Sequence, residues 1–156
     1  MIWGNLIVYN NNILRRFIIM GRPAKLTKQE LEYLGVTNIT KDGRVYQKDW
    51  EVKTYVTKHA TRFKTMEYHV ISLYDPRLYV KQKEEGKQAN GLRTICLSRA
   101  MWAWFNTECP ANMDVDHINS NSLDDRLDNF QLLTRTENLA KRKGHRNQFE
   151  KSYRGE

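Results

Sequence analysis

The sequence predicts an α+β fold, in which a β-rich N-terminal region with one short helix precedes a unit of strand, loop, strand and helix. Three observations carry this prediction. An Asp-Gly turn at residues 42–43 separates two strand-like runs, an alternating run covers Tyr68–Tyr74, and a second alternating run, Met113–His117, precedes a long polar loop. With 156 residues, of which 40% are hydrophobic, the chain can form one compact domain with a modest core.

Charge and cysteine content narrow the class of protein. The net charge of +8 favours a polyanionic partner, either nucleic acid or an acidic membrane surface. Cys96 and Cys109 are the only cysteines and form no CxxC pair, so we expect neither a structural zinc nor a disulfide framework. A reducing, cytoplasmic location is the simpler interpretation.

The first 20 residues are apolar in two short pieces that asparagines interrupt. Neither piece approaches the roughly 20 residues of a membrane span, and no basic region precedes them, so we expect no signal peptide, no anchor and no membrane contact. We therefore divide the chain into an N-terminal arm (1–25), a β-rich region (26–90) and a C-terminal unit (91–156).

Local signals predict the elements of the β-rich region. Thr27 and Glu30 have the spacing of a capping box and begin a helix that Gly35 ends. The Asp-Gly turn predicts a hairpin. The strand Tyr68–Tyr74 closes at Asp75-Pro76, and we interpret the polar run at residues 81–91 as an exposed hairpin loop.

The segment Leu92–Asn106 passes from strand alternation into a helix. Ser98 is the expected cap of this helix, and Met101, Trp102 and Phe105 are expected to share its apolar face. We interpret the tryptophans as core residues.

The C-terminal unit begins with the strand Met113–His117. Phe130–Leu133 is the expected return strand, and Thr134 with Glu137 forms a second capping box that opens a helix toward Lys143. Such a helix can lie across the hairpin, which would bring its first turns to the end of the first strand.

This arrangement would gather Asp116, His117 and Asn138 around one point. Asp116 and Asn138 offer the oxygen ligands that suit one divalent cation, Mg²⁺ or Mn²⁺, with positions left for water and a phosphate. His117 is the candidate general base, because imidazoles are largely neutral at pH 7. A hydrogen bond from its other ring nitrogen to the side-chain carbonyl of Asn129 would fix its tautomer.

Neighbouring charges fit a phosphodiester substrate. A basic strip follows the hairpin, and we expect its members to contact DNA phosphates: Arg135, Lys141, Arg142, Lys143 and Arg146. A second basic stretch with aromatic residues, within residues 48–64, could enter a DNA groove. Four aspartates near the site are interpreted as turn-forming, solubilising residues rather than metal ligands: Asp114, Asp124, Asp125 and Asp128.

In its ordered set of Asp116-His117, Asn129 and Asn138, the chain resembles the HNH endonucleases, also called the ββα-metal or His-Me finger group, and particularly their phage and intron-encoded homing type. The resemblance implies a metal-dependent DNA endonuclease in which Asp116 and Asn138 bind metal, His117 is the base and Asn129 orients it. Asn138 stands where many relatives carry His, and the zinc cysteines of some relatives are missing.

The same resemblance implies double-stranded DNA as the partner and, for a gene of a phage or mobile element, the cytoplasm of a bacterial host. One site contacts one strand, and the sequence shows no heptad pattern for dimerisation, so we expect a nicking monomer. Two alternatives stay open: a non-catalytic DNA-binding module that retains the fold, and an RNA-cutting toxin.

Overall fold

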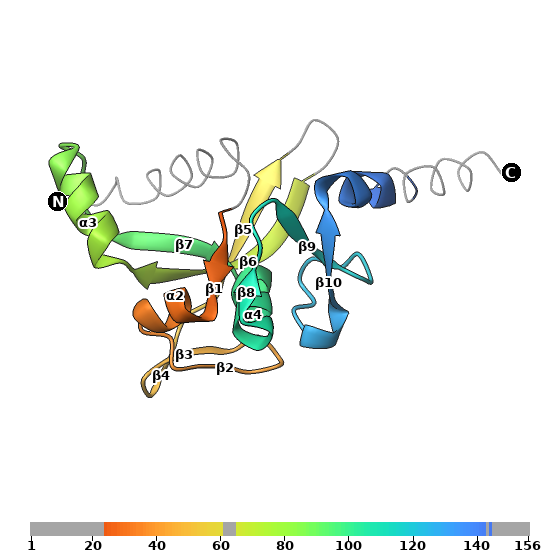
Figure 1. Ribbon diagram of the computed structural model, residues 1–156, viewed down its shortest axis with the longest axis horizontal. Coiled ribbons are helices and arrows are strands. Elements are labelled where there is room, and N and C mark those ends of the chain that lie inside the picture. Colours follow the sequence, from red (N-terminus) through yellow and green to blue (C-terminus); the bar gives the residue numbers. More distant parts are fainter. Residues whose placement is uncertain (1–23, 61–64, 143, 145–156) are drawn as a thin grey trace, which may run out of the picture.

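The computed structural model describes residues 24–60, 65–142 and 144. Its elements spread along one long axis, with helix α3 (Pro76–Glu84) at one end and the hairpin of β9 (Met113–His117) and β10 (Phe130–Thr134) at the other (Figure 1). Helix α4 (Leu97–Asn106) lies between them. The fold mixes helices and strands, which confirms the predicted α+β class.

The first elements follow the local signals closely. They are β1 (Leu26–Thr27), α2 (Lys28–Tyr33), β2 (Asn38–Ile39), β3 (Val45–Gln47) and β4 (Trp50–Glu51). The side chain of Thr27 accepts a hydrogen bond from the backbone of Glu30 at 3.1 Å, as an N-cap does. Gly43 has a φ of +88° in the turn between β2 and β3, a conformation that glycine adopts without strain.

A second sheet contains β5 (Tyr55–Ala60), β6 (Thr65–Tyr74) and β7 (Leu92–Cys96). Strand β6 contains the predicted strand and extends it toward the N-terminus. It pairs with β5 along its first part and with β7 along its last part, and Val70 belongs to both ladders. The edge of β6 before Val70 therefore has no partner in β7, and another segment of the chain can dock there.

Helix α3 occupies part of the region that we expected to be a hairpin loop. The side chain of Asp75 caps this helix by accepting a hydrogen bond from the backbone of Arg77 at 3.0 Å, and Pro76 fills the first helical position. An Asp followed by Pro favours a helix start as well as a turn, because proline needs no backbone donor at that position. The loop is thus confined to the residues between α3 and β7.

Helix α4 has the predicted position but a different start and a different buried face. It begins directly after Cys96 without a side-chain cap, so Ser98 lies inside the helix. Its buried residues are Leu97, Ala100, Met101 and Ala103. Phe105 is exposed, while both tryptophans of the helix are partly buried against the core.

A single hydrophobic cluster joins the two expected parts of the chain. Leu31 and Val45 from the β-rich region pack in the same cluster as Met101 and Phe130. Helix α4 contacts α2, β6 and β9, and so connects the two regions. No helix in the described ranges is long and apolar enough to cross a membrane.

The C-terminal hairpin matches the prediction to within a residue. Strand β9 follows the short strand β8 (Glu108–Cys109) and pairs antiparallel with β10, and a short 3-10 turn, η1 (Leu127–Asn129), precedes β10. Thr134 and Glu137 form the predicted capping box, with hydrogen bonds of 2.7 and 3.3 Å in the two directions. The helix that follows covers residues 135–142.

Candidate active site

The register of the hairpin sets which side chains share a face. Gln131 lies opposite Asp116, and Phe130 lies opposite His117. Because side chains alternate along a strand, Asp114 and Asp116 share one face of β9 and His117 belongs to the other. The neighbouring residues Asp116 and His117 therefore contact different partners.

The helix at residues 135–142 contacts the face that carries the two aspartates. Asn138 Nδ2 donates to Asp114 Oδ2 at 2.8 Å, and Arg135 reaches the same oxygen at 3.2 Å. Lys141, three residues beyond Asn138, donates to Asp116 Oδ2 at 2.5 Å. Residues three apart lie on one side of a helix. The side of this helix that contacts the aspartates therefore carries the amide of Asn138 between the positively charged side chains of Arg135 and Lys141.

Asn138 has one polar atom that the fold leaves unsatisfied. The residue is only 4% exposed, and its Oδ1 is buried without a hydrogen-bond partner. An acceptor left in this state costs about 1–3 kcal/mol, and an ion is one of the explanations that such an atom calls for. The oxygen lies in a residue that the sequence predicts to be a metal ligand.

Lys141 fills an oxygen-rich position at the end of β9. Besides Asp116, its ammonium contacts the backbone oxygen of His117 at 2.7 Å and that of Ile118 at 3.3 Å. Gln131 donates to the same Asp116 oxygen at 2.9 Å. Lys141 thus binds Asp116 in the structure, and its contact with DNA phosphates stays a prediction.

The ring of His117 is enclosed and held from two sides. The residue is 9% exposed, and its ring meets that of Phe130 edge to face, with centroids 5.1 Å apart. Its Nε2 lies 3.3 Å from Asp125 Oδ1. An ionised carboxylate can only accept a hydrogen bond, so Nε2 is the donor in this contact.

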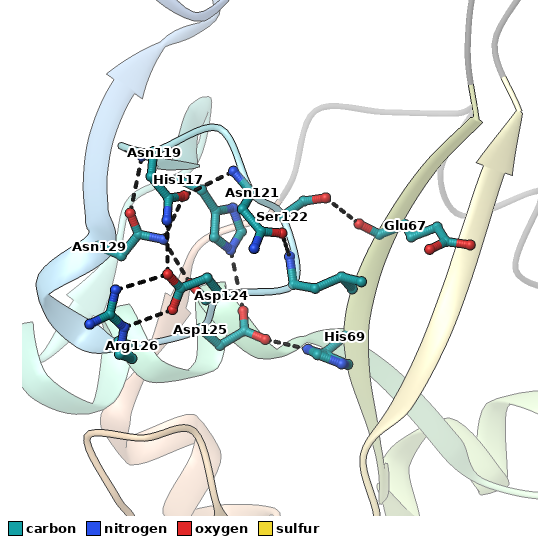
Figure 2. A network of polar contacts seen from close by, with 11 residues as sticks. Glu67, His69, His117, Asn119, Asn121, Ser122, Asp124, Asp125, Arg126 and Asn129 are labelled. Carbon is teal, nitrogen blue, oxygen red and sulfur yellow. Dashed lines mark hydrogen bonds and ion pairs between the residues drawn. The ribbon is translucent and has the colours of Figure 1, made fainter.

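Asp125 links the C-terminal unit to the β-rich region. Its second carboxylate oxygen contacts Nδ1 of His69, which lies on β6 (Figure 2). Asp125 is 8% exposed, so it is not the solvated turn residue that we expected. The carboxylate instead lies between two imidazoles.

Asn129 braces the loop between β9 and β10 rather than the ring of His117. Its Oδ1 accepts from the backbone of Asn119 at 3.1 Å, and its Nδ2 donates to the side chain of Asn119 at 3.0 Å and to the backbone oxygen of Asp124 at 2.8 Å (Figure 2). These bonds satisfy an amide that is 6% exposed. Among the described contacts, Asp125 makes the ring contact that we expected from Asn129.

Asp124 behaves as the turn residue that the sequence predicts. Arg126 makes two bonds to its carboxylate, at 2.9 and 3.0 Å, and Asn119 donates to it at 2.8 Å. The Arg126 guanidinium lowers the pKa of this carboxyl group to about 2. Asp124 thus stays charged at any pH at which the protein works, and it fixes the loop in front of the site.

Asp116 and His117 lie on β9, and Asn138 lies on the helix that covers it, but among the described contacts Asn138 bonds to Asp114 and not to Asp116 or His117. Arg142 is exposed on that helix, and Lys143 and Arg146 lie outside the described residues. In the described ranges, no three His, Cys, Asp or Glu side chains converge on a metal-sized site. The described oxygen donors at this end of the hairpin include the carboxylates of Asp114 and Asp116, the amide of Asn138, and the backbone oxygens of His117 and Ile118.

Sequence reasoning missed the roles of Asp114, Asp125 and His69. Alternation along β9 would have placed Asp114 beside Asp116, which is a signal that the sequence carries. The contact between His69 and Asp125 spans 56 residues, and no local pattern points to it.

One comparison with known proteins finds a match that includes this site. Residues 97–140, less than a third of the chain, match the family model described as HNH endonuclease. This stretch is similar to HNH endonucleases, and we refer to it as the HNH segment. The HNH segment runs from the start of α4 to the covering helix and contains Asp116, His117, Asn129 and Asn138. It also contains Asp125, whereas His69 lies outside it.

The match indicates a nuclease or DNA-binding function for residues 97–140. No curated protein and no solved structure matches the chain significantly. The detailed roles of the site residues therefore rest on the geometry above.

Proposed function

We propose that the protein is a divalent-metal-dependent DNA endonuclease that hydrolyses phosphodiester bonds. The observation that carries the proposal is the unsatisfied oxygen of Asn138, which is buried in a helix that covers Asp114 and Asp116. The residue after Asp116 is His117, whose imidazole contacts the carboxylate of Asp125. A protein that only binds DNA has no use for a buried acceptor without a partner. The HNH segment supplies the matching reaction class.

Asp116 and Asn138 are the proposed ligands of one cation, Mg²⁺ or Mn²⁺. Carboxylate and amide oxygens are the donors that these ions prefer, and few protein ligands leave room for water and a substrate phosphate. Asp114, which holds the amide of Asn138 by its nitrogen, would orient the ligand. A cation bound there stabilises the charge that develops on the phosphate and on the leaving oxygen.

His117 is the proposed general base. With its Nε2 proton donated to Asp125, the ring presents Nδ1 as the basic nitrogen that takes a proton from the attacking water. The edge contact with Phe130 and the carboxylate together fix the ring plane. Asn129 contributes indirectly, because it holds the loop that carries Asp125.

Double-stranded DNA is the proposed substrate, since the net charge of +8 favours a polyanion. Arg135 and Arg142 are exposed beside the site and are proposed phosphate contacts, together with Lys143 and Arg146. One site contacts one strand at a time, so the proposed product is a nick.

The proposal is tested with supercoiled plasmids and the purified full chain in Mg²⁺, Mn²⁺ or EDTA, followed by treatment of the product with DNA ligase. We expect nicked circles only in the presence of the cation, and we expect ligase to reseal them, because hydrolysis at the 3′ oxygen leaves a 5′ phosphate. Several DNAs of different sequence are tested, because an endonuclease can require a specific target sequence. Retardation of every DNA on a gel without cleavage in either cation would favour the binding module.

Replacement of Lys141 by methionine is expected to lower the Mg²⁺ concentration that gives half-maximal nicking. The ammonium occupies the carboxylate oxygen that the cation needs, and a partly exposed ion pair contributes up to about 1 kcal/mol, which corresponds to a shift of about fivefold. Lys81→Met, which removes one exposed positive charge from α3, far along the chain from the site, is the matched control. An equal shift in both variants would show that only net charge matters.

A further inference from the structure

The polar network of the HNH segment ends on a residue outside that segment. His69, on β6, contacts one oxygen of Asp125, and the other oxygen lies 3.3 Å from Nε2 of His117 (Figure 2). Two imidazoles thus share one carboxylate, which is 7% exposed at its side chain, while the side chain of His69 is 27% exposed. The contact crosses from the β-rich region to the proposed base.

The loop between β9 and β10 docks on β6 at two separate points. Ser122 Oγ donates to the backbone oxygen of Glu67 at 2.5 Å, and Asp125 contacts His69 two residues further along the strand. Both points lie on the part of β6 that β7 does not pair with. One anchor therefore uses the backbone of β6, and the other uses a side chain that continues to the ring of His117.

We infer that His69 is a positioning residue for His117, acting through Asp125. A carboxylate held at only one oxygen can rotate about its bond to the chain, whereas the second contact fixes the plane of the group and the direction of its bond to Nε2. Replacing an outer residue that orients a functional side chain commonly lowers activity by about 10–100-fold. The inference rests on the proposed function, in which His117 is the base.

A merely structural role predicts something different. If His69 only docked the loop on β6, then loss of either anchor would have the same effect. Ser122 supplies the matched control, because it belongs to the same loop, contacts the same strand and, among the described contacts, does not touch His117 or Asp125.

The kinetic test compares His69→Ala, His69→Asn and Ser122→Ala in single-turnover nicking with saturating DNA and Mg²⁺. We expect His69→Ala to lower the rate by about 10–100-fold with unchanged DNA affinity, and Ser122→Ala to cut at the wild-type rate. Asparagine can offer an amide nitrogen where the imidazole has Nδ1, so His69→Asn should restore most of the rate. Equal rates for His69→Ala and Ser122→Ala would overturn the inference.

A second readout does not depend on cleavage. In the full chain with ¹⁵N-labelled histidine, NMR reports the ring nitrogens of His117. We expect these signals to move in His69→Ala and in Asp125→Asn, and to keep their wild-type positions in Ser122→Ala, with thermal unfolding as the check on folding. Unchanged signals in a folded His69→Ala variant would refute the positioning role. Moved signals in a protein that cuts no DNA would instead refute the proposed function alone.

Discussion

Alanine at position 117 is expected to lower the rate of metal-dependent nicking by about 10²- to 10⁴-fold, the usual contribution of a general base. In the proposed mechanism the imidazole takes a proton from water, and Asp116 holds the cation. Single-turnover nicking of a supercoiled plasmid measures the effect. Affinity for DNA in EDTA should stay at the wild-type value, since the ring is enclosed and contacts Asp125 and Phe130.

A glutamine at the same position separates chemistry from folding. His117 packs against Phe130, so an alanine leaves a gap that can lower stability. His117→Gln retains most of the volume and a hydrogen-bond donor for Asp125, but it cannot act as a base. If this folded variant nicked at the wild-type rate, then His117 would not be the base.

Replacement of Asn138 by alanine is expected to remove most metal-dependent activity and change the free energy of unfolding little. The variant loses the hydrogen bond to Asp114, worth about 1.5–3 kcal/mol to a charged acceptor, but it also removes a buried oxygen that costs about 1–3 kcal/mol. The two terms oppose each other. Activity should fall by at least about 10–100-fold, because the cation loses a ligand.

Thermal unfolding with and without Mg²⁺ gives a readout besides activity. A cation that binds the folded protein raises its Tm, so we expect a rise in the wild type and none in Asn138→Ala. Asn106→Ala is the control, because Asn106 is an exposed asparagine on α4 whose side chain, among the described contacts, bonds only to a backbone oxygen. A rise of equal size in all three proteins would place the cation elsewhere.

The elements that local signals define could be predicted well. The alternation at Met113–His117 and the capping box at Thr134 give the hairpin and the start of its helix almost to the residue. Both signals depend on neighbours within four positions, which the sequence displays directly. Asp75-Pro76 shows the limit, since the same pair begins a turn or a helix, and the sequence does not decide between them.

Contacts between distant segments could not be predicted in this way. We expected a direct hydrogen bond between His117 and Asn129. In the folded loop, the side chain of Asn129 bonds instead to Asn119 and to the backbone oxygen of Asp124. Asp125 lies beside the ring instead, and its other carboxylate oxygen contacts His69 of β6. Such pairings depend on how the sheet of β5, β6 and β7 packs on the hairpin, and composition and periodicity do not encode that packing.

The buried face of α4 has a similar explanation. Helical spacing groups Met101 with Phe105, but α4 is covered from several directions, by α2, β6 and β9 among others. The small residues Ala100 and Ala103 therefore face its neighbours closely, and Phe105 lies near the exposed end of the helix. The tryptophans pack at the margin of the core rather than inside it.

The central claim is that Asp116 and Asn138 hold a divalent cation beside His117. Its most direct test is a crystal structure of the full chain carrying His117→Ala, grown with duplex DNA and Mn²⁺, in which anomalous scattering locates the metal. We predict a peak bonded to the Asp116 carboxylate and to Asn138 Oδ1, with Lys141 displaced from Asp116. A structure in which Lys141 still binds Asp116, and the manganese peak is absent from Asn138, would contradict the account.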